Sequence, residues 1–347
     1  SMTDRVLVTG ASGFIAKHVQ AHLLADGFEV RGTVRSLKRR PEIEAAIARA
    51  NAGCGGAAPE LVEADLTRDD GWREAAEGCR YVLHMASPFP PAEPRDPDTL
   101  IRPAREGTRR VLQAAAAGAV ERVVMTSSII AVMHVDKPDH VPRTEADWSS
   151  PGDEEMSSYG RSKTLAERQA WELIEGLRAA GSGHVPELVA INPGVVFGPA
   201  LDKDLSTSHV LLKLMGRGSY PLLPRVAFPT VDVRDVAAMH VRAMTHERAA
   251  GERFICCDET LSLRQIGEAL VDALPDLKRK VPTRHLPSGL VRFAARFDRN
   301  LRSIRGDLDK ANLCDTSKAR NELGFTFRPA REAVSSAALS LRELGVI

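Results

Sequence analysis

The 347-residue sequence has few cysteines and few aromatic residues, it lacks long apolar runs, and its charges nearly cancel. Five cysteines without a C-x-x-C pair argue against a disulfide-rich scaffold and indicate a reducing compartment, for which we expect the cytoplasm. No apolar run approaches the roughly 18 residues that a membrane-spanning helix needs, so we expect no membrane partner. A net charge of +1 gives no reason to expect binding to nucleic acid or to an anionic membrane surface.

A glycine turn near the start of the chain is the most informative feature that is present. Residues 6–8 form an apolar run typical of a buried parallel strand, and apolar residues recur at helical spacing from Ile15 onward. Between them, Thr9 to Ala16 follow the pattern T-G-x-x-G-x-x-A. Gly10 permits the tight turn, and Gly13 lets backbone N–H groups approach a pyrophosphate at the helix N-terminus. The order of strand, glycine turn and helix predicts a dinucleotide site, with a simple surface turn as the alternative.

The end of the next expected strand, residues 29–34, indicates which dinucleotide is bound. An NAD enzyme usually carries an acid there, which binds the ribose 2′-hydroxyl. Here Val34 takes that place, and Arg35, Lys38 and Arg39 follow it. A guanidinium can bind a 2′-phosphate in bidentate fashion, whereas a carboxylate would repel it. We therefore predict NADP(H), with Arg35 as the main contact and Lys38 or Arg39 assisting; a solvated basic loop is the alternative.

Strand and helix patterns alternate through the first half of the chain. Further strands are expected at 60–64, 81–85, 122–126 and 188–191, and helices at 42–52, 69–77, 99–117 and 157–179. Helices of this length between strands predict the α/β class, with a Rossmann-type doubly wound parallel sheet covered on both faces. The alternation breaks near Gly194. We expect residues 1–195, completed by about 231–258, to form the dinucleotide-binding domain, and residues 196–230 and 259–347 to form a smaller C-terminal substrate-binding lobe.

A second pattern, Tyr159-Gly160-Arg161-Ser162-Lys163, places a phenol and an ammonium on one helix face. A phenol has an ordinary pKa of about 10, and a fixed positive charge nearby lowers it toward working pH. The pattern alone could be a surface pair, but its helix follows the fifth expected strand. That strand ends in Thr126-Ser127-Ser128, and ligands of open α/β sheets bind at the carboxyl ends of strands. Hydroxyls there can face the same crevice. The alternative is that the three residues only cap the end of the strand.

Together, the glycine turn, the Ser127-Ser128 pair and Tyr159-x-x-x-Lys163 resemble the extended short-chain dehydrogenase/reductase family, over nearly the whole chain. Within that family, the likeness is to dihydroflavonol reductases, cinnamoyl-CoA reductases and microbial aldehyde and ketone reductases. The stretches that carry this finer likeness are 33–35, 82–88, 192–194, 231–237 and 321–325. The resemblance implies an oxidoreductase that reduces an aldehyde or ketone to the alcohol with NADPH.

The resemblance also implies roles for single residues. Ser128, or else Ser127, would hydrogen-bond the substrate carbonyl, and Tyr159 would donate the proton. Lys163 would hold the nicotinamide ribose and lower the pKa of Tyr159. Two hydroxyl donors at an oxygen that gains negative charge stabilise the transition state more than the ground state. The expected cofactor contacts, including those argued above, are Gly10, Ser12, Gly13, Phe14, Ile15, Arg35, Lys38, Asp65, Leu66, Met85, Ala86, Ser87, Thr126, Tyr159, Lys163, Pro193, Gly194, Val195 and Val196.

Phe89, Ile129 and Met133 are the substrate-pocket positions that the resemblance implies. They make an apolar, adaptable wall, so we expect small apolar aldehydes and ketones; a place in the core is the alternative for Ile129 and Met133. Met133 stands where flavonoid reductases carry an amide that binds a polyphenol hydroxyl, which argues against a flavonoid substrate.

Other interpretations of the sequence stay open. The alternative functions are a sugar-nucleotide epimerase or dehydratase, a hydroxysteroid-type dehydrogenase, and a non-catalytic NADP-sensing regulator. Both a monomer and a homodimer fit the family. The segment 281–309 has Val291, Phe293, Ala294 and Phe297 at helical spacing, and we expect it in the core of the second lobe. The histidines lack metal-ligand spacing, so no metal is expected, and His134 is expected to lie at the surface.

Overall fold

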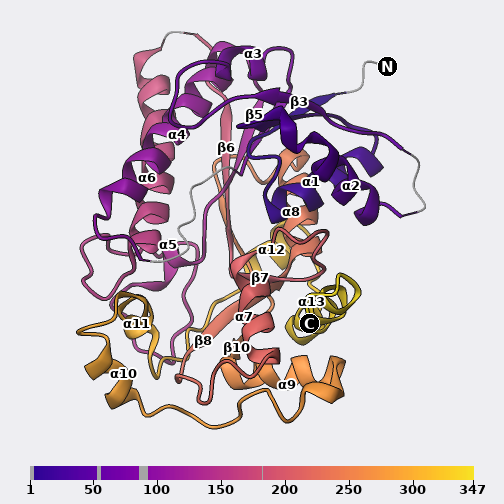
Figure 1. Ribbon diagram of the computed structural model, residues 1–347. Helices are drawn as coiled ribbons and strands as arrows, with labels where there is room; N and C mark the ends of the chain where they lie inside the picture. The colour runs from indigo at the N-terminus through magenta and orange to yellow at the C-terminus, as the bar shows by residue number, and fades with distance from the viewer. Residues whose placement is uncertain (1–3, 53–55, 86–92, 182) are drawn as a thin grey trace.

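A seven-stranded parallel sheet forms the centre of the computed structural model, which describes residues 4–52, 56–85, 93–181 and 183–347 (Figure 1). The strand order is β3-β2-β1-β4-β5-β6-β9. The strands are β1 (Arg5–Val8), β2 (Glu29–Val34), β3 (Glu60–Glu63), β4 (Tyr81–His84), β5 (Arg122–Thr126), β6 (Glu187–Pro193) and β9 (Arg253–Cys256). The order reverses between β1 and β4, where open α/β sheets bind their ligands. The predicted fold class is confirmed.

Helices cover both faces of this sheet, which explains why every residue of the central strands β4 and β5 is buried. α4 (Asp98–Ala117) and α6 (Ser158–Ala180) pack side by side on one face, and α1 (Phe14–Ala25) packs against α8 (Val233–Thr245) on the other (Figure 1). The outer helix α2 (Arg40–Ala50) contacts α1.

One helix is shorter than the sequence pattern indicates. α3 covers only Trp72–Ala76, whereas a helix over 69–77 is expected. Gly71 adopts a left-handed conformation with φ of 87°, and a Cβ there would lie 2.8 Å from the Glu63 carbonyl oxygen. The close approach to the end of β3 therefore delays the start of the helix.

A second, three-stranded sheet with the order β10-β8-β7 lies beyond the carboxyl end of the first. Its strands are β7 (Val195–Phe197), β8 (Ala227–Asp232) and β10 (Glu259–Ser262), and the helices around it are α7 (Thr207–Gly216), α9 (Leu263–Ala273) and α13 (Ala330–Glu343). These elements share a separate apolar core, and we call them the second lobe. Val231 and Asp232, which we expected in the larger unit, end β8 in this small sheet.

One expectation about the second lobe is wrong. α10 (Ser288–Ala294) buries Val291 completely, but the side chains of Phe293 and Phe297 are 58% and 79% exposed. The helix has only seven residues, so a single narrow face packs on the lobe and Phe297 lies past its end. α11 (Arg299–Ile304) follows on the outside of the lobe (Figure 1). No helix in the described ranges is long and apolar enough to cross a membrane.

Candidate active site

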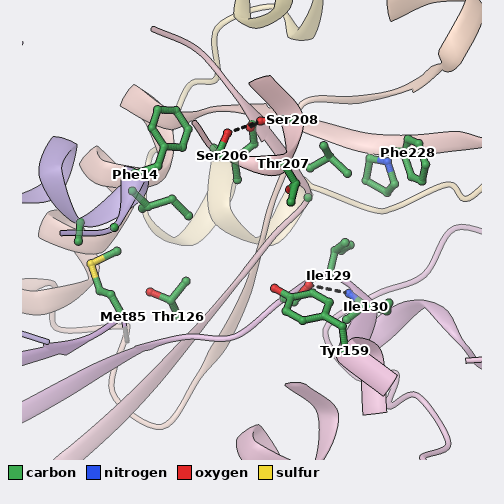
Figure 2. Close-up of a pocket in the computed structure, with 18 of the residues that line it drawn as sticks. Phe14, Met85, Thr126, Ile129, Ile130, Tyr159, Ser206, Thr207, Ser208 and Phe228 are labelled. Atoms are coloured by element: carbon green, nitrogen blue, oxygen red, sulfur yellow. Dashed lines mark hydrogen bonds between the residues drawn. The ribbon is translucent and has the colours of Figure 1, made fainter. Parts of the chain in front are cut away.

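A cavity of about 660 Å³ opens where the carboxyl ends of β1, β4, β5 and β6 face the second lobe (Figure 2). It brings together residues as far apart in the sequence as Gly10 and Asn312. The expected site residues that line it are Gly10, Ser12, Gly13, Phe14, Ile15, Met85, Thr126, Ser128, Ile129, Met133, Tyr159, Gly194, Val195 and Val196. The cavity therefore joins the expected cofactor and substrate positions in one space.

The glycine turn has the geometry that a pyrophosphate needs. Gly10 has a φ of 67°, and its N–H donates to the Thr33 hydroxyl at 3.1 Å. Gly13 precedes α1 without a side-chain cap, and the first turn of the helix carries no acid. The N–H groups in the first turn of α1, before Lys17, and the positive end of the helix dipole remain for an anion, so the residues present fit a dinucleotide.

The candidate catalytic serine and tyrosine reach the cavity from different elements. The Ser128 hydroxyl follows β5, lines the cavity and accepts a hydrogen bond from the Ile130 N–H at 3.2 Å. Ser127 is buried, does not line the cavity, and its hydroxyl has no partner among the described residues. Tyr159 lies in the first turn of α6, where the Ser157 hydroxyl caps the helix. Figure 2 shows the Tyr159 ring beside Ile129 and Ile130. Of the two serines, only Ser128 is placed to meet a substrate.

Burial dominates the pKa values of the tyrosine and lysine. The Lys163 ammonium lies 5.9 Å from the centroid of the Tyr159 ring and donates to the Thr126 carbonyl at 3.4 Å. Burial raises the pKa of the Tyr159 phenol well above its usual value and lowers the pKa of Lys163 to about 8. In the protein alone, the phenol pKa therefore moves in the opposite direction to the one expected from the nearby charge.

A buried histidine below the cavity floor went unnoticed in the sequence. His240 Nδ1 donates to the Val236 carbonyl at 2.7 Å, so Nε2 accepts from the Thr126 hydroxyl, also at 2.7 Å. Burial lowers the pKa of His240 to about 4, which keeps the ring neutral at neutral pH. The histidine fixes the orientation of Thr126, which lines the cavity. A single histidine within a helix offers no sequence signal for this role.

A buried network also holds the backbone of Ser128. Asn192 Nδ2 donates to the Ser128 carbonyl at 3.1 Å and to Glu167 at 2.6 Å. Glu167, itself fully buried, pairs with Arg253 at 2.7 Å. Glu167 lies one helical turn after Lys163. Helix α6 therefore carries both the candidate proton-transfer residues and the carboxylate that, through Asn192, holds the backbone of Ser128 in place.

Some expected residues lie away from the cavity lining. Arg35 and Lys38 are exposed after β2, and Lys163 and Pro193 are buried behind the lining residues. Hydrogen bonds from Thr67, together with the charge of Arg35, lower the pKa of Asp65. Leu66 packs against Gly107. Ala86, Ser87 and Phe89 lie outside the described residues.

Two ion pairs fasten the segment between β7 and α7 to the large sheet's helices. The Lys17 ammonium, 2% exposed, contacts Asp202 at 2.6 Å, and Arg39 contacts Asp204 at 2.8 Å. Asp204 to Ser206 and the first residues of α7 line the cavity, and the His209 ring of α7 packs edge to face on Phe14, with 4.6 Å between the ring centroids. Sequence reasoning missed the segment because it has no periodic pattern.

Gly194 joins the two sheets, because it is the single residue between β6 and β7. A Cβ at this position would fall inside contact distance of the Pro229 carbonyl in β8. Only glycine permits this approach of two backbones at the cavity wall.

Comparison with known proteins assigns the family. Residues 6–257 match the sequence profile of the NAD dependent epimerase/dehydratase family. The chain belongs to this family. Its members include the extended short-chain dehydrogenases/reductases that the sequence motifs resemble, so the expected resemblance is confirmed.

Relatives at about 30% identity extend over nearly the whole chain. The protein is 30% identical to the NADPH-dependent methylglyoxal reductase of Saccharomyces cerevisiae, over 96% of both chains. It is 32% identical to cinnamoyl-CoA reductase 1 of Petunia hybrida, over 98% of this chain and 92% of the relative. The crystal structure of yeast methylglyoxal/isovaleraldehyde reductase complexed with NADPH superimposes with a TM-score of 0.80 at 28% identity, and covers 99% of this chain and 100% of the other.

Proposed function

We propose that this family member reduces an aldehyde or ketone to the alcohol, with NADPH as the hydride donor. The observation that carries the proposal is that Ser128, Tyr159 and the glycine turn line one cavity. The named relatives are NADPH-dependent or carbonyl-reducing enzymes, which agrees with the NADP(H)-dependent oxidoreductase expected from the sequence.

The chain's own residues supply the proton and stabilise the developing charge. Bound NADPH would supply the hydride to the carbonyl carbon. The Tyr159 hydroxyl gives its proton to the carbonyl oxygen, and the Ser128 hydroxyl donates a hydrogen bond to the same oxygen. General-acid catalysis of this kind contributes about 10²- to 10⁴-fold. The raised pKa of the Tyr159 phenol keeps it protonated, and therefore ready to donate, up to alkaline pH.

The cofactor lies, in this proposal, along the carboxyl edge of the large sheet. The glycine turn binds the pyrophosphate, Arg35 and Lys38 bind the 2′-phosphate, and Asp65 and Leu66 flank the adenine. Met85, Thr126, Lys163 and residues 193–196 hold the nicotinamide ribose and ring. In this proposal, residues 1–195 with 231–258 are the cofactor domain and the remaining residues are the substrate lobe, and strands β7 and β8 of the small sheet cross this boundary. Four described cysteines are free thiols, which supports a place in the reducing cytoplasm.

The test is NADPH consumption with a panel of aldehydes and ketones, using the Tyr159→Phe variant as the blank. We expect turnover to fall at least 10²-fold in this variant, because it cannot donate the proton, while its Kd for NADPH changes less than about twofold. Intact NADPH binding shows that the variant is folded. Equal turnover in both proteins would refute the role of Tyr159, and NADPH binding without turnover of any carbonyl would refute the proposed activity.

A further inference from the structure

Three polar side chains interrupt the apolar wall at the substrate end of the cavity. His134, Asp307 and Asn312 line it, together with Phe228 and apolar residues of the α5 segment, Ile130–Met133. None of the three is needed to bind NADPH or to transfer the proton. His134, which we expected at the surface, has a side chain only 6% exposed, so that expectation is wrong. Polar groups inside an apolar cavity are costly unless they have partners, and His134 has one in Asp153, whose Oδ2 lies 3.4 Å from its Nδ1.

Hydrogen bonds place this cluster away from the glycine turn. Asn312 Nδ2 donates to the Ala227 carbonyl at 2.9 Å, next to Phe228, and to Asp307 Oδ1 at 3.2 Å. Phe228 lies at the opposite side of the cavity from Phe14, which follows the glycine turn (Figure 2). The reacting carbonyl would lie between these two ends, beside Ser128 and Tyr159.

The backbone around Asp307 is tightly fixed. A Cβ on Gly306 would lie 2.7 Å from the Glu155 carbonyl oxygen, so the short helix that ends in Asp307 is pressed against the segment before α6. Asn312 has a left-handed φ of 48°, and its carbonyl accepts from the Thr260 hydroxyl at 2.8 Å. The carboxyl and the amide are therefore held in place before any ligand arrives, which lowers the entropic cost of binding.

The carboxyl of Asp307 has unused hydrogen-bonding capacity. A carboxyl group offers about four acceptor positions, and Asp307 uses one of them, for Asn312, among the described residues. Burial raises its pKa, while the nearby His134, Asn312 and Lys310 act in the opposite direction. Both the ionised and the neutral carboxyl accept a hydrogen bond from a hydroxyl. An anionic ligand would instead meet a half-buried, negatively charged or electron-rich carboxyl group.

We propose that Asp307, supported by Asn312 and His134, is a subsite that binds a hydroxyl group at the end of the substrate remote from the reduced carbonyl. The preferred substrates are then aldehydes or ketones that carry a distant hydroxyl, and those with a carboxylate at that end are disfavoured. The inference rests on the proposed carbonyl reduction.

The test compares benzaldehydes whose ring substituents are similar in size, and the hydroxymethyl and ethyl substituents have the same number of heavy atoms. The substrates are hydroxymethyl- and ethylbenzaldehyde, with carboxybenzaldehyde as the anionic member, each as the meta and para isomer. For the better hydroxymethyl isomer, we expect a kcat/KM about tenfold above that of the ethyl compound with the same substitution, mainly through a lower KM. A tenfold ratio corresponds to about 1.4 kcal/mol, which is the contribution of one hydrogen bond. The Asp307→Leu variant should lose this preference. Asp307→Asn should keep it and accept the carboxylate at least tenfold better than the parent does.

Asp309→Asn is the matched control, because Asp309 is exposed, does not line this cavity, and has a φ of 60° that asparagine tolerates. The ratios of kcat/KM between the substrates should be the same in this variant as in the parent. Equal kcat/KM for the hydroxymethyl and ethyl substrates in the parent overturns the subsite, even if Asp307→Leu fails to fold. Turnover that persists without the preference leaves the proposed reductase intact, whereas no Tyr159-dependent turnover of any aldehyde refutes the reductase itself.

Discussion

At one end of the cavity, the wall consists of the glycine turn and the ends of parallel strands, which follow each other in regular order along the sheet. At the other end, it consists of single residues from a short helix, a loop and the edge of a second sheet. The first end presents backbone N–H groups, which suit a ligand shared across a large family. The second presents side chains, which can change one at a time. The difference explains how one scaffold keeps its cofactor while its substrates vary.

The largest expected effect concerns an ion pair between α1, which follows the glycine turn, and the segment between β7 and α7. Replacement of Asp202 by Asn leaves the Lys17 ammonium, 2% exposed, without its carboxylate. We expect a loss of about 3 kcal/mol in the free energy of unfolding, because an unpaired buried charge is costly. The matched variant Asp204→Asn breaks a pair whose partners are 39% and 50% exposed, and should lose less than about 1 kcal/mol. Denaturant unfolding of both variants measures this; equal losses would show that burial does not make the Lys17 pair stronger than the exposed one.

Acid should weaken the cofactor end through its buried histidine. The pKa of His240 is about 4 in the folded protein, below the usual 6.5, because of burial. The unfolded chain therefore binds the proton first, so the stabilisation is complete above pH 6.5 and is lost as the pH falls toward 4. This amounts to about 3 kcal/mol from His240.

His240→Gln should make the pH dependence of unfolding between pH 6.5 and 4 less steep, because glutamine keeps both hydrogen bonds but does not titrate; the remaining slope comes in part from His18 and His84, whose pKa values burial also lowers. His22→Gln, which removes a histidine that is 39% exposed, is the control and should follow the parent. A His240→Gln profile that runs parallel to the parent would exclude His240 as a source of acid sensitivity.

A smaller change at the cofactor end should leave the substrate end untouched. Arg35→Ala is expected to raise the KM for NADPH about tenfold, since it removes a charge-assisted contact to the 2′-phosphate, and to leave the KM for NADH and for the aldehyde unchanged. Arg40→Ala removes another partly exposed arginine nearby and serves as the control. Equal effects on NADPH and NADH would mean that Arg35 does not select the cofactor.

A substitution at the substrate end should have the smallest effect of the four. Met133→Ala is expected to raise the KM for an apolar aldehyde about fivefold, because it removes apolar contact area, without changing the KM for NADPH. Met133→Leu conserves volume and should behave like the parent. A parallel rise in both KM values would show that Met133 supports the whole cavity rather than one end.

The sequence predicts the cofactor end well because its signals are local. The glycine turn and the Tyr159/Lys163 spacing each fall within one turn or one helix, so neighbouring residues define them. Asp307 and Asn312 face the cavity only because Gly306 and the small sheet place them there, and no short pattern records that. The direction of the Tyr159 pKa shift likewise depends on burial, which the pair spacing does not contain.

Gly194 has a consequence for the construction of chimeric enzymes from members of this family. The two backbones that touch at Gly194 and Pro229 lie 35 positions apart, one on each side of α7. A crossover point between Gly194 and Pro229 would take the glycine from one parent enzyme and the strand that it contacts from the other. Recombination of substrate lobes should therefore transfer residues 194–229 as one cassette, with its boundaries outside the touching pair.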